Sequence, residues 1–152
     1  MAESTDRVAR LTAAYRSILA HYEEIERLSE EERDVLLEPT GEIHRVNEVL
    51  ARKKAVLAEI RDEEERVKGA REWWKKVRRT LPPGAGRDLL SLLDAISRAV
   101  ERLLALESEC RRLLEQKTAW GRNQQPVPSA AGARFGANAA YGRTASFEGD
   151  RS

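Results

Sequence analysis

The sequence predicts an all-α protein, a long antiparallel three-helix coiled-coil bundle followed by a disordered C-terminal tail. Apolar residues recur at intervals of three and four over residues 5–37, 42–81 and 87–117, which is the period of amphipathic helices. Turns that contain proline and glycine separate these three segments. No segment alternates apolar and polar residues as a half-buried strand does. Long helices joined by short connections fold back on one another as antiparallel neighbours.

The first predicted helix covers residues 5–37. Ser4, Thr5 and Asp6 are candidate N-caps, because their side-chain oxygens can accept hydrogen bonds from backbone N–H groups of the first turn. Pro39 lies just beyond the helix and cannot donate a helical hydrogen bond. The apolar stripe consists of Val8, Leu11, Tyr15, Ile18, Tyr22, Ile25 and Leu28.

The second predicted helix covers residues 42–81 and ends at Pro82-Pro83-Gly84. Its apolar residues share one heptad grid, namely Ile43, Val46, Leu50, Leu57, Ile60, Val67, Trp74 and Leu81. Lys53 and Glu64 occupy the same grid. They are interpreted either as devices that fix the register of the helices or as solvated positions where the bundle is only two helices wide.

The third predicted helix covers residues 87–117 and is the most apolar of the three. One column contains Leu89, Leu92, Ile96, Ala99, Leu103, Leu106, Cys110 and Leu113, and Leu90, Leu93, Val100, Leu104 and Leu114 widen it. Two columns indicate a helix that faces two partners. We predict a partner-binding groove that includes Leu93, Val100, Leu104 and Leu114. Cys110, on the seam, is expected to be a small buried hydrophobe.

The composition changes at Ala119, so residues 1–118 are predicted to form the bundle and residues 119–152 a flexible tail. The tail contains no Leu, Ile or Met and cannot bury enough apolar surface to fold alone. Phe135, Tyr141 and Phe147 stand six residues apart, which places them on one side of an extended chain. They are interpreted either as anchors that become ordered on a protein partner or as incidental aromatics of a linker.

Charge and motifs exclude several classes of function. The chain has 27 Lys and Arg against 26 Asp and Glu, and this balance argues against nucleic acid as its main partner. A single cysteine excludes an internal disulfide and a multi-thiolate metal site. No phosphate-binding loop or nucleophile motif occurs, so we expect neither an enzyme nor a cofactor.

Two pairs of residues have a spacing that could serve a metal ion, His21 with Glu24 and His44 with Glu48. Helices rich in Glu produce such pairs by chance, so we expect solvated helix faces and no metal. The N-terminus has no apolar run, and no stretch of about 18 apolar residues occurs. A cytoplasmic protein that does not insert into membranes is therefore expected.

The stretch from Glu72 to Arg79 combines Trp73 and Trp74 with four basic residues. Aromatic rings beside Lys and Arg are typical of single-stranded nucleic-acid binding. Alternatively, Trp74 packs in the seam, Trp73 lies at its edge, and the basic side chains complement the negative C-terminal end of the helix dipole. The near-neutral net charge favours the second interpretation.

The layout of residues 5–142 resembles the flagellar secretion chaperones of the FlgN type. The resemblance depends on VNEVLARKKAVLAEI in the second helix, LLALESECRRLLEQK in the third and Tyr141-Gly142 in the tail. It implies a cytoplasmic protein that binds hook–filament junction proteins and delivers them to the type III export gate. Phe135, Tyr141, Gly142 and Phe147 would then bind the partner. The Trp73-Trp74 pair departs from the family pattern. The alternative is a structural coiled-coil scaffold or self-associating protein, and a homodimer would use the same seams.

Overall fold

The computed structural model describes residues 2–120, and within this range every regular element is a helix. The elements are α1 (Ala2–Leu37), α2 (Ile43–Arg66), α3 (Lys68–Val77) and α4 (Arg87–Trp120). The prediction of an all-α body is confirmed for these residues. The predicted number of helices is wrong, because there are four in this range and not three.

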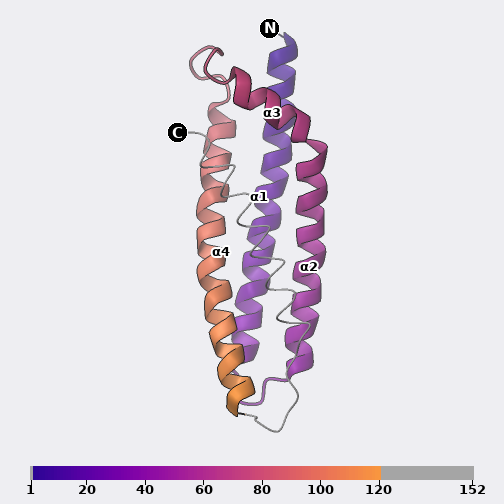
Figure 1. Cartoon of the computed structure of the whole chain (residues 1–152), viewed down its shortest axis with the longest axis vertical. Helices are drawn as coiled ribbons and strands as arrows, with labels where there is room; N and C mark the ends of the chain where they lie inside the picture. The colour runs from indigo at the N-terminus through magenta and orange to yellow at the C-terminus, as the bar shows by residue number, and fades with distance from the viewer. Residues whose placement is uncertain (1, 121–152) are drawn as a thin grey trace.

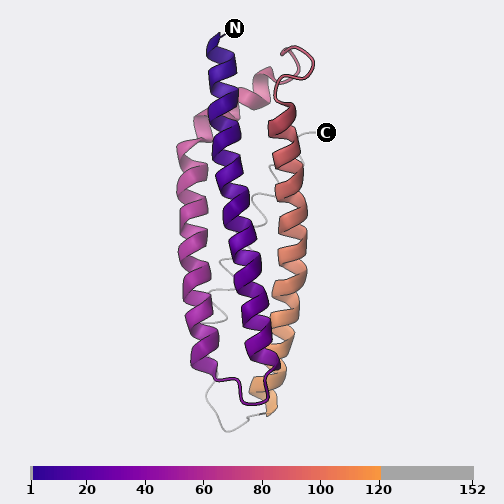
Figure 2. The ribbon, with the colours of Figure 1, turned by 180° about the vertical axis from the view of Figure 1, so that it is seen from behind.

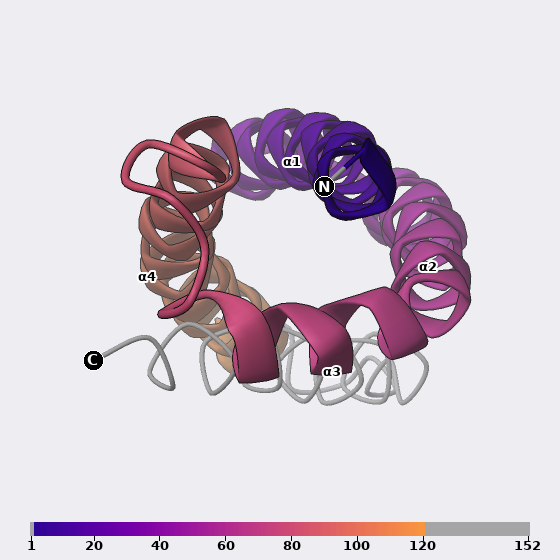
Figure 3. The same cartoon turned by 90° about the horizontal axis from the view of Figure 1, so that it is seen from above.

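The three long helices α1, α2 and α4 lie side by side, and α2 runs antiparallel to the other two (Figures 1 and 2). Helix α1 packs against both α2 and α4, whereas no Cα atom of α2 lies within 8 Å of a Cα atom of α4. Seen from above, α1 lies between α2 and α4, and α3 crosses on the opposite side (Figure 3). The central helix is therefore α1, and its closest partner, α4, runs parallel to it.

The apolar stripe of α1 explains this central position. Its residues from Leu11 to Ile25 at intervals of three and four are at most 1% exposed, so the face they share is covered by both neighbours. The larger hydrophobic cluster joins this stripe to α2, α3 and α4 and includes Leu57, Ile60, Trp74, Leu89, Leu93, Ile96, Ala99, Val100 and Leu103. A smaller cluster lies toward the α1–α2 turn and contains Val35, Leu36, Val46, Leu50 and Cys110.

The predicted helix over residues 42–81 is two helices, α2 and α3. Val67 separates them with φ −100° and ψ 7°, which lies outside the helical region, and Gly69 follows in the first turn of α3. Helix α2 has 24 residues and α1 has 36, so at 1.5 Å per residue α2 is about 18 Å shorter. Helix α3 follows at the end of α2 and crosses the body there, so it covers the part of the body that α2 is too short to reach. Trp74 belongs to the heptad grid of the sequence although it lies on the crossing helix. Its side chain still reaches the core, where it is 2% exposed.

Candidate functional site

The four residues of the predicted helical groove lie at different depths in the structure. Leu93 and Val100 are each 1% exposed and belong to the core. Leu104 is 39% exposed, and Leu114 is half-buried and packs on the smaller cluster. The groove as predicted is therefore incorrect in part, because Leu93 and Val100 already have partners inside the protein.

The second column of α4 faces α2. Glu107 belongs to this column, since it lies three residues from Leu104 and seven from Leu114. Its carboxylate contacts the ammonium group of Lys53 on α2. Because the backbones of α2 and α4 stay apart, the residues of this column that are not fully buried keep accessible surface. We call the two that keep accessible surface, Leu104 and Leu114, the α2–α4 face. Leu90 is also 40% exposed, but it lies beside the turn that precedes α4, with Gly84, Ala85 and Arg87.

A layer of buried polar side chains separates the two hydrophobic clusters. Lys53 Nζ lies 3.0 Å from Glu32 Oε1 of α1 and also contacts Glu107 Oε1 of α4. Ser29 Oγ donates a hydrogen bond to Glu107 Oε1 at 2.9 Å. All four residues are at most 2% exposed. This group, Ser29, Glu32, Lys53 and Glu107, is called the buried polar layer, and it links all three long helices.

The buried polar layer decides between the two interpretations of Lys53. A residue that is 2% exposed is not solvated, so that interpretation is wrong for Lys53. A buried charged residue can contact partners on two other helices only when the three helices are aligned in one way. Lys53 therefore has the property expected of a residue that fixes the register of the helices. Glu64, the second polar residue on the grid, is half-buried.

Cys110 lies beside this layer, and its Sγ is 3.5 Å from the backbone oxygen of Ser29. The residue is fully buried, as the sequence predicted. Burial, and secondarily the negative charge of Glu107, raises the pKa of the Cys110 thiol to about 12. The thiol is therefore protonated at neutral pH and is a poor nucleophile.

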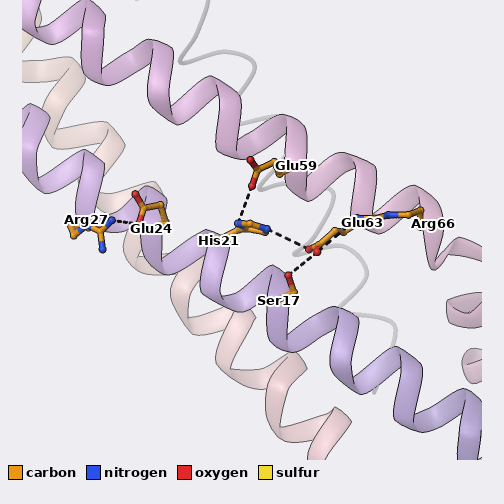
Figure 4. A network of polar contacts seen from close by, with 7 residues as sticks. All are labelled: Ser17, His21, Glu24, Arg27, Glu59, Glu63 and Arg66. Carbon is orange, nitrogen blue, oxygen red and sulfur yellow. Dashed lines mark hydrogen bonds and ion pairs between the residues drawn. The ribbon is translucent and has the colours of Figure 1, made fainter.

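A second polar network joins α1 to α2 on the surface (Figure 4). His21 Nδ1 lies 3.4 Å from Glu59 Oε2, and His21 Nε2 lies 3.7 Å from Glu63 Oε2. Ser17 Oγ donates a hydrogen bond to Glu63 Oε1 at 2.7 Å. The imidazole thus lies between two carboxylates of α2. Glu24, which the sequence spacing had paired with His21, contacts Arg27 instead.

The second histidine, His44, contacts Glu42 and not Glu48, the residue that its sequence spacing suggested. His44 Nδ1 lies 3.1 Å from Glu42 Oε2, and both side chains are 65% exposed. Over residues 2–120, no group of three or more His, Cys, Asp and Glu side chains has the geometry to hold a metal ion. In this structure both histidines lie beside carboxylates at the protein surface, His21 beside Glu59 and Glu63 and His44 beside Glu42.

The tryptophan pair of α3 turns toward the protein. Trp74 is 2% exposed, and Trp73 is half-buried with the guanidinium carbon of Arg7 at 5.4 Å from its ring centroid. This arrangement matches the seam interpretation, with Trp74 in the core and Trp73 at its edge. Trp74 therefore has no face on which a base could stack, and the guanidinium of Arg7 lies over the ring of Trp73.

The predicted tail contacts Phe135, Tyr141, Gly142 and Phe147 lie outside the described residues. The residues that sequence reasoning missed are Ser29, Glu32 and Glu107 of the buried polar layer. A signal existed for Glu32, because it lies seven residues after Ile25 and so continues the apolar stripe of α1. Glu107 stands next to Leu106 within the Leu-rich helix, but only the fold brings it to Lys53.

None of the helices formed by residues 2–120 has the length and apolar character needed to cross a bilayer. No protein-family model, curated protein or solved structure matches the chain.

Proposed function

We propose that this chain is a cytoplasmic export chaperone that binds hook–filament junction proteins and delivers them to the type III export apparatus. The observation that supports this proposal most directly is the α2–α4 face. Leu104 is 39% exposed there, and the two helices that border this face, α2 and α4, both pack against α1. Apolar side chains in such a position suit an amphipathic helix of a protein client.

The proposal includes two features that the sequence predicted. The three long helices pack as a coiled coil, as their heptad stripes suggest. The tail residues Phe135, Tyr141, Gly142 and Phe147 supply a second contact with the client, which adds to the affinity of the helical body because the two contacts are linked. The layout shared with the FlgN-type chaperones supports the choice of client.

The test uses purified hook–filament junction protein from the same organism. Mixed with the full chain, it should form a discrete complex in size-exclusion chromatography with light scattering. Leu104→Glu places a charge on the α2–α4 face and should weaken this complex at least tenfold. Leu37→Glu is the matched control, because Leu37 is 58% exposed at the end of α1 and does not belong to that face. Equal affinity of the two variants would contradict the proposed binding surface.

The competing function, a self-associating scaffold, makes a different prediction in the same experiment. A scaffold that used the α2–α4 face would form dimers or larger species without any client, and Leu104→Glu would return it to a monomer. Light scattering on the protein alone, over a range of concentrations, separates the two functions. A concentration-independent monomer that captures the junction protein supports the chaperone.

A further inference from the structure

The nearly neutral net charge of the chain conceals a strong separation of charge along it. Residues 2–65 contain ten basic and seventeen acidic residues, a net charge of −7. Residues 66–79, which comprise α3 and its flanks, contain seven basic residues and one acidic residue, a net charge of +6. Residues 80–120 are balanced. Within residues 2–120, the excess of positive over negative charge is thus confined to one ten-residue helix and its flanks.

The fold places this positive charge at one end of the body and directs part of it outward. Helix α3 crosses on the side opposite α1, near the end where α1 and α4 begin (Figures 1 and 3). Trp74 points into the core, so the opposite side of α3 is turned away from the protein. Lys68, Lys76 and Arg79 are exposed on that side, together with Glu72.

Exposed apolar residues adjoin this basic helix. Pro82, Pro83 and Ala85 are exposed in the turn that follows α3, and Leu90, in the first turns of α4, is 40% exposed. Basic side chains next to a few accessible apolar ones are typical of segments that lie in the interface of an anionic bilayer. Nucleic acid is less well matched, because neither aromatic residue of α3 is exposed: Trp74 is buried in the core and Trp73 is half-buried under the guanidinium of Arg7.

We propose that the α3 end of the protein is a peripheral docking surface for anionic phospholipid headgroups, with Lys68, Lys76 and Arg79 as the main contacts. The proposal goes beyond the chaperone function and does not depend on it. Glu72 lies on the same side of α3 and opposes the interaction. Because the apolar side of α3 is already buried in the protein, the helix docks on the bilayer surface and does not insert into it.

The test is flotation of the full chain with vesicles of phosphatidylcholine with or without phosphatidylglycerol, at two salt concentrations. Binding should require phosphatidylglycerol and should weaken as salt increases. Each basic residue near an anionic surface contributes roughly fivefold in affinity. The triple variant Lys68→Glu, Lys76→Glu, Arg79→Glu should therefore lose at least about 100-fold.

A matched control variant also replaces three basic residues by Glu and so has the same net charge, but its three substitutions lie outside the α3 end of the protein. Lys54, Arg111 and Arg112 are exposed, and Arg111 and Arg112 lie in the half of α4 remote from α3. Their replacement by Glu should cost less than about fivefold. An equal loss in both triple variants would overturn the proposal, because it would show adsorption by net charge alone. Circular dichroism checks that both variants keep their helices.

The conservative variant Glu72→Gln tests the same surface without a loss of function. Removal of the opposing charge should tighten vesicle binding roughly fivefold, with the melting temperature unchanged. No gain in this variant, or no binding of the wild-type chain to anionic vesicles, would overturn the proposal. Tighter binding to a single-stranded or duplex oligonucleotide than to vesicles at the same salt, lost in the α3 triple variant, would assign this surface to nucleic acid.

Discussion

The indole ring of Trp74 lies directly against the backbone of Gly86. A Cβ atom at position 86 would contact Cη2 of the ring and lie 2.8 Å from its Cζ3. Gly86 also has a φ of +79°, which residues with a Cβ rarely adopt. The turn into α4 thus depends on a glycine for two separate reasons, and the ring of α3 holds that turn against the core.

Gly86→Ala should therefore destabilise the protein by about 2–4 kcal/mol, which combines the cost of positive φ with overpacking against Trp74. Gly84→Ala is the control, since its φ is +89° but its nearest neighbour is the Arg87 side chain at 3.7 Å. That change should cost only about 1–2 kcal/mol. Urea unfolding followed by circular dichroism measures both, and equal losses would show that Trp74 adapts to the added methyl group.

The buried polar layer should respond in opposite directions to partial and complete removal. Lys53→Met leaves Glu32 and Glu107 without their buried ammonium partner and should cost about 3–5 kcal/mol. Replacing the three residues together, with Met at 53 and Leu at 32 and 107, should be neutral or stabilising by about 1–4 kcal/mol. Chemical denaturation of the single and triple variants tests this. A triple variant less stable than Lys53→Met would show that the layer contributes net stability.

The sequence predicted the helical class and the two proline-containing turns because both depend on local information, the period of apolar residues and the missing N–H of proline. It did not predict the change of direction at Val67. The heptad grid includes both Val67 and Trp74, and a long side chain can reach the core from a crossing helix as well as from a straight one. The composition of α4 predicted two apolar columns. Which residues of these two columns are buried depends on the distance between α2 and α4. That distance is a property of the tertiary structure and could not be predicted from the sequence.

The buried polar layer could be predicted from the sequence only in part. Lys53 was visible as a charged residue on a seam, but its partners Glu32 and Glu107 are 21 and 54 residues away in sequence. Glu is frequent in each of the three long helices, so charge alone could not select these two. Only the relative alignment of the three long helices does so.

Cys110 should be unreactive in the folded protein. The pKa of its thiol is raised from 9.0 to about 12, and the residue is buried, so thiolate is scarce and inaccessible. Labelling with a disulfide reagent at pH 8 should be slow in buffer and rapid in denaturant. Since the folded-state pKa is the higher one, the thiol's contribution to stability is complete below pH 9 and declines as the pH rises toward 12. Rapid labelling without denaturant would mean that α4 opens locally.

Leu103 and Leu104 are neighbours in sequence with opposite roles in this structure. Leu103 is 0% exposed in the larger cluster, whereas Leu104 is 39% exposed on the α2–α4 face. Leu103→Ala should cost about 2–5 kcal/mol, since it leaves a cavity in the core. Leu104→Ala removes less buried surface and should cost less than about 1 kcal/mol.

The same two variants, assayed for binding of the hook–filament junction protein below their melting temperatures, separate folding from function. Leu104→Ala should weaken capture while its melting curve stays close to wild type. Leu103→Ala should melt earlier but bind normally wherever it is folded, because its side chain does not reach the α2–α4 face. If instead Leu103→Ala lost binding while still folded and Leu104→Ala did not, the client would have to enter the core between the helices, and the α2–α4 face would not be its docking surface.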